Sequence, residues 1–237
     1  MREAGRVSAR ALRLVGEAVR PGITTGELDR IAEKAILADG GVPAFKGYHG
    51  FPKTLCTSVN CQVVHGIPAD TIVLREGDVI SVDVGAIVGG YFGDNAATFA
   101  VGEIGDEARQ LLDATKASLH AGIEQARAGN HLFDIGAAVQ GVAEKAGFSV
   151  VREYVGHGIG RNMHEDPNVP NYGIAGKGPR LEVGMVLAIE PMVNAGEAGV
   201  ESLPDGWTVV TRDGRLSAHF EHTVAITESG PVILTQE

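Results

Sequence analysis

Four acidic residues of this 237-residue sequence stand in or beside apolar strand-like runs, where an isolated negative charge is costly. They are Asp83, Asp94, Glu190 and Glu221. Lys and Arg residues are scarce near them in the sequence, so ion pairing does not explain them. A bound cation does. Because four negative charges are neutralised by two divalent ions and not by one, the pattern predicts a two-metal site.

The two aspartates lie in a predicted β-hairpin. An alternating strand reaches Gly89-Gly90, which is a two-residue hairpin signal, and the chain then runs back. With these glycines as the loop, Asp83 pairs with Ala96, and Asp94 lies on the same face. The carboxylates are then diagonal neighbours roughly 7 to 8 Å apart at the backbone, so both can converge on one ion or ion pair. Two unrelated polar positions in an exposed hairpin are the alternative.

Three histidines stand next to glycines or in glycine-containing segments. His157 lies between Gly156 and Gly158, so we expect a backbone loop to bring its imidazole close to a metal without a steric clash. His65 and His164 lie in similar loop contexts. A single histidine of this kind is more often a structural hydrogen-bonding residue than a ligand. Their combination with the carboxylates is what makes them candidates.

The elements that must position these residues alternate between helix pairs and strands. Apolar residues at helical spacing predict helices over 2–19 and 24–40, the second with the capping-box spacing of Thr24 and Glu27. A second helix pair is predicted over 106–126 and 135–146, with strand-like runs over 54–98 and from Ser149 onward. This order predicts an α+β fold. The tetrapeptide at 32–35 recurs at 143–146 and hints weakly at two related halves.

Composition restricts the class of protein. A chain of 237 residues with 44% hydrophobic content can bury one sizeable core, so a single domain is expected. No apolar run approaches the roughly 18 residues of a membrane span and no signal peptide is evident, which predicts a cytoplasmic protein without membrane contact. The net charge of −10 argues against direct DNA binding. Cys56 and Cys61 are too few for a disulfide scaffold and are expected to be reduced.

Six segments together resemble the type I methionine aminopeptidases of the pita-bread metallopeptidase family. They occur in the family's order and approximate spacing over nearly the whole chain: GYHGFPK at 47–53, VHGIP at 64–68, Asp83 with Asp94, GHGIG at 156–160, IEP at 189–191 and FEHT at 220–223. The resemblance implies one catalytic metallopeptidase domain over residues 1–237. It also implies a pita-bread fold, in which an antiparallel sheet is covered by two helix pairs in pseudo-twofold halves.

The resemblance implies a role for each candidate ligand. Asp94, His157, Glu190 and Glu221 would hold one metal, Asp83 would bind the second, and Asp94 and Glu221 would bridge both. These are the same five residues that the charge pattern and the glycine-flanked histidine suggest. Such a mixed set suits Mn, Fe, Co or Zn better than Mg or Ca. Two ions roughly 3.5 to 4 Å apart would activate water and polarise the scissile carbonyl.

The resemblance also implies catalytic and substrate-binding residues. Glu190 would move the proton, and His65 and His164 would contact the peptide and the transition state. The methionine side chain would lie among Tyr48, Phe51, Cys56 and Trp207. The expected activity is removal of the initiator methionine from proteins whose second residue is small. Its expected substrates are N-terminal methionyl peptides, with nascent chains at the ribosome as the natural source.

Three positions depart from the family's common pattern. Phe45 stands where a small Cys is frequent and Met163 where an aromatic residue is frequent, which puts the size of the pocket in question. His219 replaces a residue that is often Gln, two positions before Glu221 on the same predicted strand face, where it would support that ligand or serve only as an exposed polar residue. A short N-terminal segment of the family is expected to be absent.

Three other functions fit parts of the pattern. An Xaa-Pro aminopeptidase of the same fold would keep the five ligands, but the short length and Trp207 argue against it. A noncatalytic module that binds peptide, RNA or the ribosome would be marked by lost ligands, whereas all five are present. A structural metal-binding protein is disfavoured because His65 and His164 add polar groups beyond the ligands.

Overall fold

Two helix pairs alternate with strands along the chain, as the sequence predicts, in a computed structural model that describes residues 1–236. The helices are α1 (Arg2–Ala18), α2 (Thr25–Ala38), α3 (Asp106–Gln125) and α4 (Leu132–Lys145), with a short 3-10 turn η1 (Tyr48–Gly50). The capping box of Thr24 and Glu27 is present at the start of α2. Helix α4 begins at Leu132, earlier than predicted, because the Asp134 carboxylate accepts a 2.7 Å hydrogen bond from the His131 amide and caps the first turn.

Fifteen strands pair in antiparallel fashion within the described residues, and all but β1, which lies in a segment expected to be a loop, fall largely in the predicted regions. They are β1 (Val42–Pro43), β2 (Leu55–Val59), β3 (Gln62–Val64), β4 (Val79–Val88), β5 (Tyr91–Ala100), β6 (Ser149–Val150), β7 (Gly156–Gly158), β8 (Glu165–Val169), β9 (Val186–Ile189), β10 (Met192–Asn194), β11 (Val200–Ser202), β12 (Val209–Thr211), β13 (Ser217–His219), β14 (Glu221–Thr227) and β15 (Gly230–Ile233). The α+β class is therefore confirmed.

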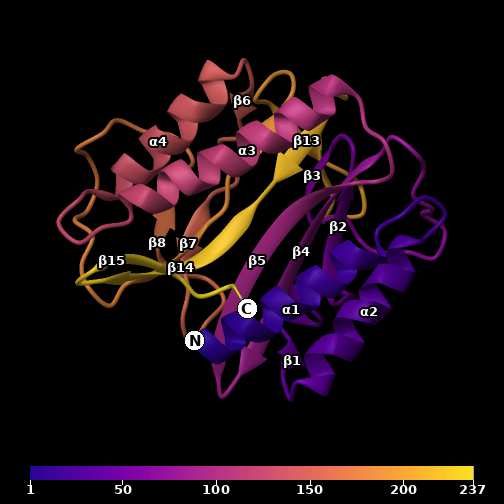
Figure 1. Cartoon of the computed structure of the whole chain (residues 1–237), viewed down its shortest axis with the longest axis horizontal. Coiled ribbons are helices and arrows are strands. Elements are labelled where there is room, and N and C mark those ends of the chain that lie inside the picture. The colour runs from indigo at the N-terminus through magenta and orange to yellow at the C-terminus, as the bar shows by residue number, and fades with distance from the viewer. Residues whose placement is uncertain (237) are drawn as a thin grey trace.

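One large sheet connects the two halves of the chain. Its strands run in the order β1-β4-β5-β14-β9-β7-β8, with β2 paired to β4 and β15 paired to β14. Two smaller sheets, β13-β10-β6 and β11-β12-β3, lie beside it. In Figure 1 all four helices lie on the near side of the strands, with α1 and α2 over one part of the sheet and α3 and α4 over the other.

Side-chain alternation decides which face of the large sheet is buried by the helices. Ile80, Val82 and Val84 of β4 belong to the apolar core formed with α1 and α2, and Val224 and Ile226 of β14 belong to the core formed with α3 and α4. Successive residues of a strand point to opposite faces. The carboxylates at the odd-numbered positions 83 and 221 therefore lie on the face that the helices do not cover.

Close packing of α1 on β5 gives a stability prediction at Gly93. A Cβ at this position would lie 2.5 Å from the Gly5 amide nitrogen and 2.6 Å from the Ala4 carbonyl carbon, and backbone cannot yield as a flexible side chain would. Gly93→Ala should therefore lower the free energy of unfolding by roughly 1 to 3 kcal/mol, as overpacking does. Thermal and urea unfolding followed by circular dichroism would measure it.

Gly141, exposed in the middle of α4, is the matched control for that substitution. No atom of residues 1–236 lies within 4 Å of a Cβ built there, apart from the neighbouring residues and the helix's own backbone. Because alanine restricts the unfolded chain and favours a helix, Gly141→Ala should raise the free energy of unfolding by roughly 0.5 to 1 kcal/mol. Equal effects of the two substitutions would contradict the packing argument.

Candidate active site

The predicted hairpin and its register are confirmed. Strands β4 and β5 pair with Asp83 opposite Ala96 and Gly85 opposite Asp94, joined by the two-residue turn at Gly89-Gly90. The two aspartates are therefore diagonal neighbours on one face of the hairpin. This face looks away from the helices.

Two cross-strand rows of the large sheet carry four of the five candidate ligands. The first row crosses β2, β4, β5 and β14 through Cys56, Asp83, Ala96 and Glu221. The second crosses β4, β5, β14, β9 and β7 through Gly85, Asp94, Thr223, Ala188 and His157. The residues between the ligands are small, so their side chains leave room above the sheet for the longer ligand side chains to converge.

The hydroxyl of Thr223 ties Asp94 to β14. It accepts a 3.0 Å hydrogen bond from the Asp94 amide and donates a 2.8 Å hydrogen bond to the Asp94 carbonyl. A side chain thus takes the place of a backbone group in the ladder between β5 and β14. The backbone that carries Asp94 is fixed relative to the strand that carries Glu221.

His157 lies in a strand, which corrects the loop expected from its flanking glycines. A Cβ at Gly156 would strike the Ala188 carbonyl oxygen, and one at Gly158 would strike the Asp166 carbonyl oxygen. The glycines therefore allow the neighbouring strand backbones to approach β7 closely. They do not serve to form a flexible loop.

Hydrogen bonding at the His157 ring favours the tautomer that a metal ligand requires. Nδ1 lies 2.8 Å from the Gly158 carbonyl oxygen, and a carbonyl can only accept, so Nδ1 carries the proton. The lone pair of Nε2 is then directed into the site, where Nε2 lies 3.5 Å from Oε1 of Glu190. Burial, followed by the charge of His164, lowers the His157 pKa to about 4, so the ring is neutral at pH 7.

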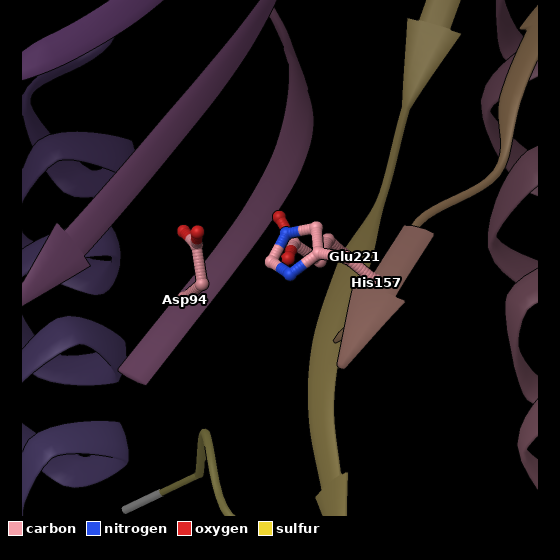
Figure 2. A group of neighbouring side chains, drawn as sticks. All are labelled: Asp94, His157 and Glu221. Carbon is pink, nitrogen blue, oxygen red and sulfur yellow. The ribbon is translucent and has the colours of Figure 1, made fainter. Parts of the chain in front are cut away.

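Three of the candidate ligands form a compact buried cluster. One potential ligand atom from each of Asp94, His157 and Glu221 lies within 4.8 Å of the other two. Figure 2 shows these side chains projecting from three different strands into the same space. Asp83 and Glu190 line the same cavity. The structure thus brings together all five residues of the predicted ligand set.

Several buried polar atoms at this cluster have no hydrogen-bond partner among residues 1–236. They are Asp83 Oδ1, Asp94 Oδ1, Glu221 Oε1 and His219 Nε2. Buried carboxylate oxygens are strong acceptors that cost free energy when unpaired. Three such oxygens beside a deprotonated imidazole nitrogen form a donor set for divalent transition metals. The residues therefore fit a metal site.

The carboxylates resist ionisation together. Burial raises the pKa of Asp83, Glu190 and Glu221 well above the usual range, and the charge of Asp94 raises each further. Burial also raises the pKa of Asp94 to about 7. A bound cation would favour the ionised forms of these groups, so its binding is coupled to proton release. Such shifts are typical of functional sites.

His164 and His65 stand at the same cavity. Tyr48 Oη lies 2.8 Å from His164 Nδ1, and the rings of His164 and His157 are 4.3 Å apart. His65 has a backbone φ of 61°, which is uncommon for a residue with a side chain, and its ring meets that of Tyr154 edge-on. Burial, and then the charge of His164, lowers the His65 pKa to about 4.

The cavity has a volume of about 410 Å³ and is lined by all the predicted metal ligands, catalytic histidines and pocket residues. Its apolar part is formed by the predicted Tyr48, Phe51, Cys56 and Trp207, with Phe45 and Met163 beside them. Phe51 and Trp207 meet edge-on with ring centroids 5.1 Å apart. Burial, then the charge of Asp83, raises the pKa of Cys56, so its thiol is not a nucleophile.

Phe45 occupies space that Gly85 leaves open on the site face. A Cβ at Gly85 would lie 2.7 Å from Cε1 of the Phe45 ring. Because Gly85 pairs with Asp94, the ring lies on the floor of the site beside the carboxylates. His49, with a φ of 48°, also lines the cavity and is not among the predicted site residues. Its place within the segment 47–53 was the only signal.

The structure corrects the expected position of His219. Phe220 interrupts the strand, so His219 ends β13, which pairs with β10, while Glu221 begins β14. His219 is 1% exposed, and its Nε2 lies 3.7 Å from Oε2 of Glu190. Burial, then the charge of His65, lowers the His219 pKa to about 3. His219 is thus not an exposed polar residue.

Comparison with known proteins gives consistent results. The sequence profile of metallopeptidase family M24 matches residues 1–228. Methionine aminopeptidase of Clostridium acetobutylicum is 55% identical over 235 residues, which cover 99% of this chain and 94% of that protein. The crystal structure of methionine aminopeptidase from Thermotoga maritima superposes with a TM-score of 0.99 at 46% identity, covering 100% of this chain and 95% of that one.

A more distant structure has a different specificity. X-Pro aminopeptidase from Thermotoga maritima superposes with a TM-score of 0.76 at 23% identity, and the match covers 100% of this chain but 59% of that one. At this level the likeness concerns the fold alone. The pita-bread fold is therefore shared, whereas the high identity over full length lies with methionine aminopeptidases.

Proposed function

The chain belongs to metallopeptidase family M24, and we propose that its methionine aminopeptidase activity uses two metal ions held by the five converging ligands. The observation that carries this proposal is the buried Asp94–His157–Glu221 cluster, with its unpaired carboxylate oxygens, at the end of a mostly aromatic pocket. A metal centre and an apolar side-chain pocket are the two parts that such an exopeptidase needs.

Each ligand has a proposed role. Asp94, His157, Glu190 and Glu221 would hold one ion and Asp83 would hold the second, with Asp94 and Glu221 shared between the two. The set of four carboxylates and one imidazole suits Mn, Fe, Co or Zn. When bound, the ions polarise the scissile carbonyl and lower the pKa of the attacking water.

The proposed proton carrier is Glu190. Its buried carboxyl group lines the cavity beside the other candidate ligands, 3.5 Å from His157 Nε2, where it can reach a proton of the attacking water. Glu190 takes a proton from the attacking water and gives it to the leaving amine. The products are free methionine and the shortened peptide.

The contact with Tyr48 supports a proposed donor role for His164. If Tyr48 donates its hydroxyl proton to Nδ1, then Nε2 carries the remaining ring proton. Burial, and then His49, lowers the His164 pKa, which favours this neutral form. His164 then donates to the carbonyl oxygen of the substrate as negative charge develops there, and His65 contacts the same peptide.

Tyr48, Phe51, Cys56 and Trp207 form the proposed pocket for the methionine side chain, where aromatic edges contact the thioether sulfur. Residues 1–237 act as a single catalytic domain. Over residues 1–236, no helix has the length and apolar character that crossing a membrane requires. The proposed substrates are N-terminal methionyl peptides, including nascent chains at the ribosome, and the proposed location is the cytoplasm.

Peptide specificity tests this function. We expect metal-reconstituted protein to release methionine from Met-Ala-Ser but not from Met-Lys-Ser, because the peptide backbone must pass close to the metals and His65. A clash of about 3 kcal/mol would lower kcat/KM by about 100-fold. Release of free amino acid, followed by chromatography, is the measurement.

Ala-Pro-Ala is the comparison peptide for the same preparation. It should remain intact, because its first side chain does not fill the apolar pocket. Faster cleavage of Ala-Pro-Ala than of Met-Ala-Ser would identify an Xaa-Pro aminopeptidase instead. Full metal loading without cleavage of any of the three peptides would indicate a binding module.

A further inference from the structure

Glu190 lies between two imidazoles, only one of which belongs to the proposed ligand set. His157 Nε2 is 3.5 Å from Oε1 of Glu190, and His219 Nε2 is 3.7 Å from Oε2. The two rings come from different strands, β7 and β13, and each approaches a different oxygen of the carboxylate. His219 therefore stands where it can act on Glu190.

The strand register explains this approach. His222 pairs with Ile189 across β14 and β9, and His219 pairs with Met192 across β13 and β10. Both pairs have the same register, so Glu190, in the two-residue gap between β9 and β10, is a diagonal neighbour of His219 at the end of β13. Long side chains at diagonal positions are within reach of each other.

The backbone of His219 is held by the hairpin that carries the two aspartates. Thr98 Oγ1 on β5 accepts a 2.8 Å hydrogen bond from the His219 amide and donates a 2.9 Å hydrogen bond to its carbonyl. The same hydroxyl lies 2.8 Å from Ser81 Oγ on β4. The His219 ring is thus positioned relative to Asp83 and Asp94.

The Nε2 atom of His219 is buried without a partner among the described residues. The other unpaired atoms of the site are carboxylate oxygens, which a cation satisfies. A protonated ring nitrogen needs an acceptor instead, and Oε2 of Glu190 is the carboxylate oxygen beside it. Closure by about half an ångström would bring this pair into hydrogen-bond range.

We propose that His219 is a positioning residue for Glu190: its Nε2–H donates to Oε2 and turns Oε1 toward His157 and the metal. This inference rests on the proposed function, in which Glu190 is a ligand and proton carrier. It assigns His219 to Glu190 and not to Glu221. Without the donor, Glu190 is free to rotate, so metal binding and the chemical step weaken while the methionine pocket is unchanged.

Three variants of the full chain test this role. His219→Leu removes the donor with little change in volume, and His219→Gln keeps an N–H donor. His222→Leu is the matched control, because His222 is a largely buried histidine beside Glu221 on the opposite face, where its Nδ1 bonds Thr235. Co(II) affinity by calorimetry, the Co(II) absorption spectrum, and kcat and KM on Met-Ala-Ser are the readouts.

We expect His219→Leu to bind Co(II) 10- to 100-fold more weakly, the range found when partners of metal ligands are removed. Its kcat should fall with KM unchanged, and His219→Gln should restore both affinity and kcat. His222→Leu should keep wild-type affinity. If His219→Leu is like wild type, or if His219→Gln fails as His219→Leu does, the proposed hydrogen bond is wrong. If His219→Gln fails as His219→Leu does and the Co(II) spectrum is also altered, His219 would be a metal ligand itself.

A double-mutant cycle with Glu190→Ala distinguishes the positioning role of His219 from the ligand role of Glu190. If His219 acts through Glu190, then His219→Leu should cause no further loss of Co(II) affinity in the Glu190→Ala background. Additive losses would overturn the positioning role and leave the proposed function intact. Wild-type affinity in Glu190→Ala alone would instead overturn the ligand role of Glu190 in the proposed function.

Discussion

Asp94→Asn and Glu221→Gln are each expected to lose bound metal and turnover together. Both residues are proposed to bridge the two ions, so one substitution disturbs both. The loss of kcat/KM should exceed the 10- to 100-fold range that is typical when a residue behind a ligand is changed. Elemental analysis of the purified variants and turnover of Met-Ala-Ser are the measurements. Two metals per chain with full activity in either variant would contradict the bridging role of the substituted residue.

Stability measurements distinguish this outcome from misfolding. In the presence of a chelator, Asp94→Asn should be at least as stable as wild type, because it removes one of four buried carboxyl groups whose ionisation burial opposes. Metal at a hundred times its Kd stabilises wild type by about 2.7 kcal/mol, or about 5 to 10 °C in Tm for a chain of this size. Asp94→Asn should be stabilised much less by the same concentration of metal. Asp113→Asn, at an exposed position on α3, should behave as wild type.

The hairpin shows why part of the site could be predicted from sequence. A two-residue turn fixes the register of the strands that flank it, so the pairing of Asp83 with Ala96 follows from local geometry. The helices could also be predicted from local signals, because apolar residues recur at helical spacing and a capping box marks the start of α2. The start of helix α4 differs from the prediction because its cap uses His131 and Asp134 in place of a Ser or Thr cap.

Contacts between distant segments could not be predicted in this way. No local signal says that Glu221 lies opposite Ala96, because the two positions are joined by neither a turn nor a repeat. Only the family resemblance predicts that Glu221 lies with the aspartates in one metal site. The glycines beside His157 were interpreted as a loop because their tight contacts come from neighbouring strands far away in sequence. The break in the strand at Phe220 has no local sequence signal. It depends on Thr98, a residue of another strand, whose hydroxyl bonds the backbone amide and carbonyl of His219.

His157 and His164 should respond differently to replacement by alanine, although their rings are 4.3 Å apart. His157 Nε2 faces the carboxylates with its lone pair, so His157→Ala removes a proposed ligand. Metal affinity and turnover should fall together, and excess metal should partly restore turnover. Calorimetric Co(II) titration, and turnover at low and saturating metal, would show the effect.

His164→Ala should instead keep both metals and lose the chemical step. His164 Nδ1 lies 2.8 Å from Tyr48 Oη, and Nε2–H is proposed to donate to the reacting carbonyl, so removing this side chain should cost stabilisation of the transition state alone. Loss of one such donor lowers kcat by about 100- to 1000-fold, and excess metal should not restore it. Tyr48→Phe should cause a smaller loss, because it removes only the group that fixes the tautomer. Equal metal loss in the two histidine variants would show that both are ligands, whereas unchanged turnover in His164→Ala would leave that residue a structural role.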